Sequence, residues 1–268
     1  MKSRRKKLIV SGCSFTTKDY RSSAYPQRDT SYPKWPELLA EKLDMDCINL
    51  AFSGAGNEFI FQTLCEAIIR TPKDEIGMVV AAWSQANRYD WQLHKDIDHM
   101  MYNETYLKGF TWYNHRLDKK GDVFSWVRSD VLKMITLQKL CEGLNIPYKQ
   151  FQMISLFSGY ISGLVKTELE VRSINENKTG DNIRHTYPGD KKKDYNKCCE
   201  ILLNYDQYIN AKNYIGWPLA KRLGGFHMGE KLENENGTHN LEYTIGKYDP
   251  HPNKLGHEKI AKEVYESF

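Results

Sequence analysis

The chain has 268 residues, of which 40% are hydrophobic and 12% aromatic, enough to bury the core of one large domain. Its net charge is +4 and the basic residues are mixed with acidic ones, so the composition gives no indication of nucleic-acid binding. No apolar run has the length of a transmembrane helix, and we expect no membrane contact. Residues 8–10 form an apolar run far shorter than the roughly 7–15 residues of a signal-peptide core, which predicts synthesis in the cytoplasm without a signal peptide.

Short apolar runs and amphipathic stretches alternate along the chain. The runs predict strands, and the stretches, with apolar residues three or four positions apart, predict helices. In chain order we expect strands at 8–10, 47–51, 78–83 and 147–154, and helices at 37–43, 58–70, 125–144 and 254–268, with Asn253 as the N-cap of the last helix. Two segments predict insertions: 89–123, which is rich in aromatic and polar residues, and 166–240, which is polar and has no period.

This alternation predicts one α/β domain over residues 1–268, a three-layer α/β/α fold of the flavodoxin-like type. Its parallel sheet is covered by helices on both faces, and the two insertions form a cap. Polar or glycine-rich clusters follow the first three strands and precede the last helix. Because such junctions converge on one edge of a parallel sheet, we expect a site there.

A serine, a histidine and a carboxylate lie at those junctions. Ser14 follows the first strand, and one short loop carries Asp249 and His251, where Pro250 and Pro252 restrict the imidazole. A serine nucleophile needs a base within hydrogen-bonding reach, and the base needs an acid that fixes its tautomer. Serine after a strand and histidine before a helix are more often turn formers or caps, so the residues alone leave both roles open.

Four short blocks together resemble the SGNH (GDSL-type) hydrolase superfamily. The blocks, in the family's order, are Gly12-Cys13-Ser14-Phe15-Thr16 for the nucleophile, Asn49-Leu50-Ala51-Phe52-Ser53-Gly54 for the glycine, residues 83–88 at the place of the third block, and Asp249-Pro250-His251-Pro252-Asn253 for the histidine. The resemblance covers the chain except for the two insertions. It is closest to divergent members that are common in viral and environmental genomes.

The resemblance implies ester hydrolysis through an acyl-enzyme, without a cofactor or a metal. Ser14 is then the nucleophile, His251 the base and Asp249 the acid that orients the base. Two departures concern these residues: Cys13 stands where the family has Asp, and Asp249 precedes His251 by two residues where the family has three. His257 is an alternative base, although it falls inside the last predicted helix.

The oxyanion donors that the resemblance implies are the backbone amides of Ser14 and Gly54 and one side-chain amide. The third block lacks the family's Gly-x-Asn-Asp, and alignment without gaps puts Ala86 at the position of the Asn. A shift of one residue brings Asn87 or Gln85 there. We expect Asn87, because the shorter side chain loses less rotamer freedom when it is fixed.

The expected substrate is a short acyl ester on a small molecule or a glycan, such as an O-acetylated sugar. Trp91, Trp112 and Trp217 fall within the insertions and could stack on sugar rings, or could pack the insertions onto the sheet. Two other functions stay open. One is a non-catalytic structural or glycan-binding protein that keeps the fold, for instance a virion-associated protein of a phage, and the other is an acyltransferase with the same triad. The sequence leaves the oligomeric state open.

Two further patterns do not predict a ligand. His94, Asp96, Asp98 and His99 have the composition of a metal site, but the five-residue spacing of the histidines does not put them on one helical face. The turn at residues 54–56 lacks the third glycine and the downstream acid of a dinucleotide-binding fingerprint. We therefore expect neither a metal nor a nucleotide cofactor.

Overall fold

The computed structural model describes residues 5–94, 110–116, 122–157 and 191–268. A five-stranded sheet stands at the centre in the order β2-β1-β3-β6-β7, and all its neighbouring strands are parallel. The strands are β1 (Lys7–Ser11), β2 (Asp46–Asn49), β3 (Ile76–Trp83), β6 (Tyr148–Gln152) and β7 (Tyr214–Ile215). This is the strand order of flavodoxin-like sheets, in which the direction of winding changes between the first and third strands.

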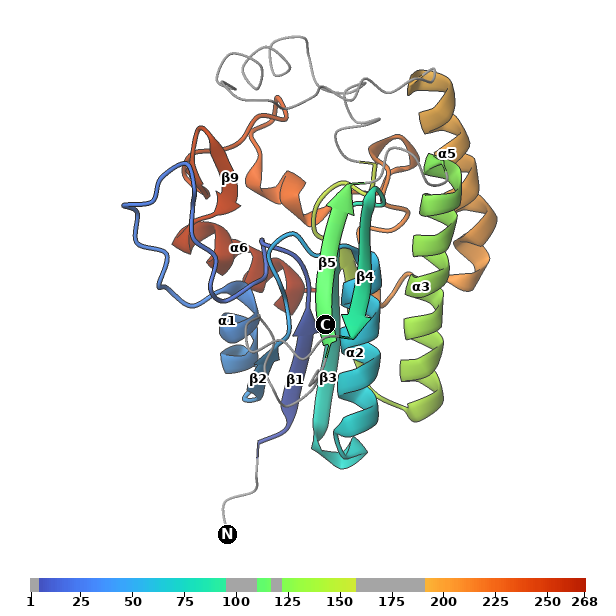
Figure 1. Ribbon diagram of the computed structural model, residues 1–268, viewed down its shortest axis with the longest axis horizontal. Helices are drawn as coiled ribbons and strands as arrows, with labels where there is room; N and C mark the ends of the chain where they lie inside the picture. The colour runs from blue at the N-terminus through green and yellow to red at the C-terminus, as the bar shows by residue number, and fades with distance from the viewer. Residues whose placement is uncertain (1–4, 95–109, 117–121, 158–190) are drawn as a thin grey trace.

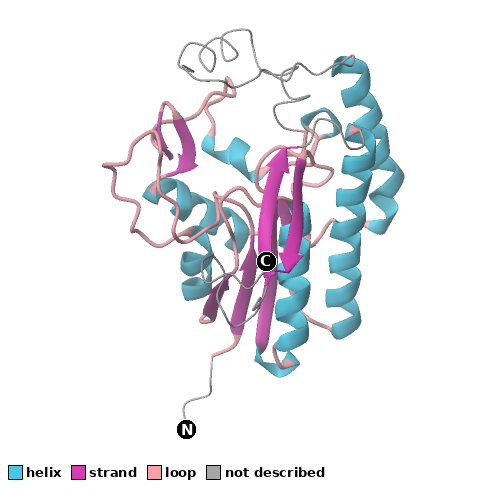
Figure 2. Cartoon of the chain, viewed as in Figure 1, coloured by secondary structure: helices cyan, strands magenta, loops and turns pink. Residues whose placement is uncertain are grey.

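Helices cover both faces of the sheet (Figure 1, Figure 2). One face carries α1 (Trp35–Lys42) and α6 (Lys254–Tyr265), and the other carries α2 (Asn57–Arg70), α3 (Val123–Leu144) and α5 (Lys191–Tyr205). Short 3-10 turns lie at Lys73–Glu75, Asp206–Tyr208, Lys221–Leu223 and Met228–Leu232. The predicted three-layer α/β/α fold is confirmed. Within the described ranges, no helix combines the length and the hydropathy needed to cross a membrane.

The central strands are apolar on both sides because both sides are covered. Successive residues of a strand point to opposite faces of the sheet. In β1, Leu8 and Val10 join the core under α1 and α6, whereas Ile9 joins the core under α2, α3 and α5. All three side chains are fully buried. An unbroken apolar run is therefore what this position in the sheet requires.

Residues 191–215 differ from the sequence analysis, which expects an insertion without a period there. Instead, α5 packs along α3, and β7 pairs with β6 as the last strand of the sheet. α5 begins with charged residues, and its apolar stripe is too short to stand out in the sequence. The stripe includes Cys198 and Leu202, which are both fully buried. β7 has two residues, too few for a period to appear in the sequence.

Two antiparallel pairs stand apart from the main sheet. β4 (Arg88–His94) pairs with β5 (Phe110–Arg116), and β8 (Thr244–Gly246) pairs with β9 (Asp249–Pro252). The first pair falls within the insertion expected at 89–123, and β4 contacts α2. Residues 95–109, 117–121 and 158–190 lie outside the described residues, so the cap stays a prediction.

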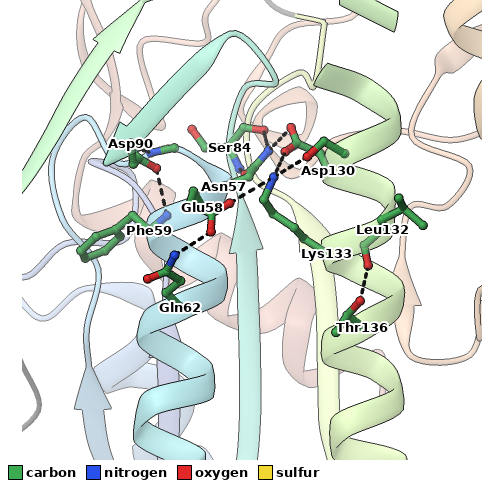
Figure 3. Close-up of polar contacts among 12 residues, drawn as sticks. Asn57, Glu58, Phe59, Gln62, Ser84, Asp90, Asp130, Leu132, Lys133 and Thr136 are labelled. Carbon is green, nitrogen blue, oxygen red and sulfur yellow. Dashed lines mark hydrogen bonds and ion pairs between the residues drawn. The ribbon is translucent and has the colours of Figure 1, made fainter. Parts of the chain in front are cut away.

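A buried polar network joins the end of β3 to α2 and α3 (Figure 3). Asn57 donates through Nδ2 to Asp130 Oδ2 at 2.7 Å and to the Ser84 carbonyl at 3.1 Å, and its Oδ1 accepts from the Ser84 amide at 2.6 Å. Lys133 pairs with Asp130 at 3.2 Å and with Glu58 at 3.4 Å. Burial is the largest influence on the pKa of Asp130 and raises it to about 6, although Lys133 and Asn57 act in the other direction. Lys133 and Asn57 therefore stabilise the ionised form of the Asp130 carboxylate.

We expect Asp130→Ala to lower the free energy of unfolding by about 3–5 kcal/mol, because it leaves buried charged and polar partners without their acceptor. Arg128→Ala, at an exposed position of the same helix, is the matched control and should change the free energy by less than about 0.5 kcal/mol. Denaturant unfolding of both variants measures the difference. Equal effects would contradict a stabilising role for the network.

Candidate active site

Ser14 lies in a tight turn directly after β1. The Cys13 carbonyl accepts hydrogen bonds from the amides of Thr16 at 2.8 Å and Thr17 at 3.1 Å, which closes the turn. Gly12 begins the turn, and a Cβ at this position would stand 2.5 Å from Thr16 Oγ1. The close approach of Thr16 therefore requires glycine here.

The loop that follows β2 fixes this turn from one side. Phe52 donates its amide to the Gly12 carbonyl at 3.0 Å, and Asn49 Nδ2 donates to the Thr16 carbonyl at 2.9 Å. Asn49 also holds its own loop, since its Oδ1 accepts from the Ala51 amide at 3.1 Å. The first and second blocks are thus joined by direct hydrogen bonds.

Gly54 has a left-handed backbone conformation with φ of +87°. It lies in a turn that is closed by a hydrogen bond from the Ala55 amide to the Phe52 carbonyl at 3.2 Å. Type II turns require a positive φ at this third position, which favours glycine. A Cβ at Gly54 would meet nothing within 4 Å, so the backbone conformation, and not a lack of space, selects glycine.

His251 joins Ser14 to Asp249. Its Nε2 lies 2.7 Å from Ser14 Oγ, and its Nδ1 lies 2.6 Å from Asp249 Oδ1. Asp249 and His251 both lie on β9, and side chains two residues apart on a strand point to the same side. The sequence predicts a loop here, but the segment is a strand. The strand explains the two-residue spacing, because it turns both side chains to the same side. The structure brings the three side chains into one hydrogen-bonded chain, and their catalytic roles stay a prediction.

The Asp249 carboxylate is buried and ionised. Burial by itself raises the pKa of Asp249, but hydrogen bonds from His251 and Ser22 outweigh it and hold the pKa well below its usual range. The backbone amide of His251 also donates to Asp249 Oδ1 at 3.0 Å. An ionised carboxylate opposite Nδ1 favours the tautomer with its proton on Nδ1, which leaves Nε2 to accept a proton from Ser14.

Asn253 holds β9 at the start of α6. Its Oδ1 accepts from the Gly256 amide at 3.0 Å, which confirms the predicted N-cap. Its Nδ2 donates to the carbonyls of Glu242 at 2.8 Å and Thr244 at 3.1 Å. One side chain thus ends β9, begins α6 and ties both to β8.

Ser14 Oγ bonds His251, and the alternative base His257 has a different partner. Its side chain is buried, and its Nδ1 accepts from the Trp35 amide at 3.2 Å. Burial, and then the charges of Lys34 and His251, lower the pKa of His257 to about 3. The imidazole is a neutral group of the core between α1 and α6.

Two of the expected oxyanion donors lie in the loops already described. Among the described residues, no backbone acceptor takes the amide hydrogen of Ser14, and the role of this amide as a donor stays a prediction. Gly54 already takes part in another interaction, and its role as a donor stays a prediction.

The third block lies beside the glycine block. The Arg88 amide donates to the Gln85 carbonyl at 3.2 Å, which closes a turn over residues 85–88, and the Arg88 guanidinium donates to the Ala55 carbonyl at 3.1 Å. Ala86 donates its amide to the Leu156 carbonyl at 2.9 Å. The roles of Asn87 and Gln85 as oxyanion donors stay a prediction, because such a donor would point at the oxygen of a bound ester.

Sequence reasoning misses two residues of the site. Tyr20 donates its hydroxyl hydrogen to Asp249 Oδ2 at 2.9 Å, and Ser22 bonds the same carboxylate. Both lie in the polar loop between β1 and α1, which has no period. The edge rule for parallel sheets is the one signal that could have found them, because this loop leaves the sheet at the same edge as Ser14.

Other candidates of the sequence analysis fall elsewhere. Trp217 packs edge-on against Tyr214, with 5.3 Å between the ring centroids, and its Nε1 donates to Asp206 Oδ1 at 2.7 Å. Its ring therefore packs against other protein side chains. The side chains of Trp91 and Trp112, and residues 96–99 of the metal-like cluster, lie outside what the structure describes. The described ranges contain no group of three side chains that could hold a metal ion.

The sequence matches no family model and no curated protein. Solved structures are similar in fold over nearly the whole chain. One is a protein described as lipolytic, of the G-D-S-L family, from Desulfitobacterium hafniense DCB-2, with 11% identity, coverage of 98% of this chain and 99% of that chain, and a TM-score of 0.46. Another is the psychrotrophic esterase EstA from Pseudoalteromonas sp., with 12% identity, coverage of 98% and 96%, and a TM-score of 0.42. A third is a protein described as a GDSL-like lipase from Parabacteroides merdae ATCC 43184, with 14% identity, coverage of 98% and 95%, and a TM-score of 0.41. At these low identities and TM-scores, the likenesses assign neither a family nor an activity to this chain.

We expect Asn87→Ala to lower kcat for an ester by about 10²-fold or more, the usual cost of losing one oxyanion donor, and Gln85→Ala to have little effect. Steady-state kinetics of the two variants, with Ser14→Ala as the inactive reference, make the comparison. The reverse order would assign the role to Gln85. No effect in either variant would mean that backbone amides alone form the oxyanion hole.

Proposed function

We propose that the protein is a serine esterase of the SGNH (GDSL) type, which hydrolyses short acyl esters through an acyl-enzyme. One observation carries the proposal: the continuous hydrogen-bonded chain from Ser14 Oγ through His251 to Asp249, with distances of 2.7 Å and 2.6 Å. A surface serine or a helix-capping histidine has no need of the other two groups. The chain stands at the end of β1, beside the point where the sheet changes its direction of winding, which is where α/β folds bind ligands.

In the acylation step, Ser14 Oγ forms a bond to the carbonyl carbon of the ester, and its proton passes to His251 Nε2. The carbonyl electron pair moves onto oxygen, where the Ser14 and Gly54 amides, with Asn87 or Gln85, are the proposed donors. The tetrahedral intermediate then collapses and breaks the bond to the leaving alkoxide, which takes the proton from Nε2.

In the second step, water replaces the alcohol. His251 Nε2 takes a proton from the water, whose oxygen attacks the acyl carbon. The tetrahedral intermediate then breaks its bond to Ser14 Oγ, which takes the proton back from Nε2, and the carboxylic acid is released. Asp249 stays ionised throughout and holds the imidazole in one orientation. An acyltransferase would use the same groups with an alcohol in place of water, so the product separates these two alternatives.

The proposed substrate is an O-acetyl or similar short acyl ester on a glycan. The support is compositional: residues 89–123 and 166–240 are rich in Tyr, Asn and Lys and lack the long runs of Leu, Ile and Val of a fatty-acyl tunnel. Residues 191–215 do not contribute to this argument, because α5 and β7 belong to the main fold. Aromatic, amide and hydroxyl groups suit sugar rings better than alkyl chains. Trp217 gives no support, because it packs on Tyr214.

Labelling by a fluorophosphonate tests the nucleophile. We expect the probe to attach to Ser14 at neutral pH, and His251→Ala to slow the labelling by at least about 10²-fold, because a positioned base contributes about 10²–10⁴. Ser23→Ala, which removes an exposed hydroxyl of the neighbouring loop, is the control and should label at the native rate. Labelling that is absent from the native protein would favour the alternative of a non-catalytic binding or structural protein.

A panel of esters tests the substrate class. We expect the rate on p-nitrophenyl esters to fall from acetate through butyrate to octanoate, and acetate to be released from an acetylated xylan or an O-acetylated sialic acid. Ser14→Ala supplies the background rate. A rate that rises with chain length, with no acetate released from glycans, would reject the glycan proposal and indicate a lipid or thioester substrate.

A further inference from the structure

Tyr20 contacts two members of the triad from a loop far away in the sequence. Its hydroxyl donates to Asp249 Oδ2 at 2.9 Å. Its ring stacks on the imidazole of His251, with the ring centroids 4.0 Å apart and the planes at 24°. One side chain therefore meets both the carboxylate and the base.

The hydroxyl of Tyr20 occupies the oxygen of Asp249 that His251 leaves open. Oδ1 accepts from the ring and the backbone amide of His251, at 2.6 Å and 3.0 Å, and Oδ2 accepts from Tyr20. With a fixed donor on each oxygen, the carboxylate cannot rotate about its Cβ–Cγ bond without losing a hydrogen bond. Burial, and then the hydrogen bond and charge of Asp249, raise the pKa of Tyr20 far above its usual value, so the phenol stays protonated and donates.

The ring of Tyr20 restricts the imidazole itself. Phe15, next to the nucleophile, contacts the same imidazole at 4.5 Å between centroids and 41° between planes. The two aromatic rings limit rotation of His251 away from Ser14. Because an aromatic face attracts a cation, they also stabilise the imidazolium that forms when His251 takes the serine proton.

We propose that Tyr20 is a positioning residue of the active site, which extends the hydrogen-bonded chain to Tyr20–Asp249–His251–Ser14. The proposal rests on the proposed esterase function. Tyr20 acts through Asp249 and His251 and is not assigned a contact with substrate. Its hydroxyl fixes the carboxylate, and its ring fixes the plane of the base.

The alternative is that Tyr20 only packs its own loop. Other contacts anchor that loop without the Tyr20 side chain: Thr30 Oγ1 donates to the Tyr20 carbonyl at 2.8 Å, Tyr32 donates its hydroxyl hydrogen to the Pro252 carbonyl at 3.2 Å, and Arg28 bonds the Ile245 carbonyl. Loss of the Tyr20 hydroxyl should therefore leave the fold in place. Tyr32→Phe is the matched control, because it removes a half-buried tyrosine hydroxyl of the same loop that bonds backbone beside His251 and not the triad.

The pH profile of kcat/KM distinguishes positioning from packing. The titratable groups around His251 are Asp249 on β9, Tyr20 and Tyr32 on the loop, and His257 on α6. Burial raises the pKa of Tyr32 to about 12 and lowers the pKa of His257 to about 3. Hydrogen bonds from His251 and Ser22 hold the pKa of Asp249 well below its usual range. None of these neighbours therefore accounts for a change in the acid limb of the profile near neutral pH.

We expect Tyr20→Phe to lower kcat for p-nitrophenyl acetate about tenfold at unchanged KM, a fraction of the 10²–10⁴ that a positioned base supplies. The acid limb should move to higher pH, because the carboxylate with one donor fewer holds the proton on the imidazole more tightly. Tyr20→Leu, which also loses the stacked ring, should be slower than Tyr20→Phe. Tyr32→Phe should stay within about twofold of native, since it leaves the base in place.

Three results would overturn the proposal. They are a Tyr20→Phe enzyme with native kcat and a native acid limb, a change confined to KM, which would indicate substrate contact, and a Tyr32→Phe enzyme that behaves as Tyr20→Phe does. Where a variant is partly unfolded, the fluorophosphonate reaction keeps the test valid, because unfolding lowers the amplitude of labelling and mispositioning lowers its rate constant. Ser14→Ala separates the two proposals: if it keeps native activity the esterase function fails, and if it is inactive while Tyr20→Phe is native, only the role of Tyr20 fails.

Discussion

The hydrogen bond between Ser14 Oγ and His251 Nε2, 2.7 Å long, is the contact on which the proposed chemistry depends. The two residues are 237 positions apart, so the whole fold is needed to bring them together. β1 places Ser14 at the carboxyl end of the sheet's strands. The strand is held rigidly, because its apolar side chains are buried on both faces of the sheet. β9 places His251 opposite, held by its pairing with β8 and by the Asn253 side chain at the start of α6. Each end of the contact is thus fixed by a separate set of backbone hydrogen bonds.

Polar contacts hold the second block to the first and the start of the third block to α2. Asn49 and Phe52 bond the turn that carries Ser14, while Asn57 bonds both backbone groups of Ser84 at the end of β3. The partner of Asn57 on α3, Asp130, is charged and buried, so removing either side chain takes a buried partner from the other in the core. The loop of residues 85–88 therefore begins from a clamped position. This clamp gives residues 85–88 a defined place, although Ala86 stands where the resemblance to SGNH hydrolases predicts an asparagine.

Much of the fold could be predicted because its signals are local. β1 and β3 are short unbroken apolar runs, α2 and α3 have apolar stripes of helical period, and glycine and proline residues mark several of the ends. The elements that sequence reasoning missed depend on tertiary contacts. β7 is a strand only because β6 offers it a partner, and α5 is stabilised by its packing on α3 more than by its own pattern. The candidate site divides in the same way: Ser14, Asp249 and His251 lie in recognisable blocks, whereas Tyr20 lies in an irregular loop whose contact with Asp249 no spacing could indicate.

The central claim is that Ser14 carries the acyl group during the reaction, and direct mapping of the acyl-enzyme tests it most closely. The native protein is mixed with p-nitrophenyl acetate, quenched in acid within the first turnover, digested and sequenced by mass spectrometry. The account predicts one acetyl ester on Ser14, resolved from the neighbouring Cys13, with a burst of p-nitrophenol of matching size. Hydrolysis of the ester with no acetyl group on Ser14, or with the acetyl group on another residue, would contradict it.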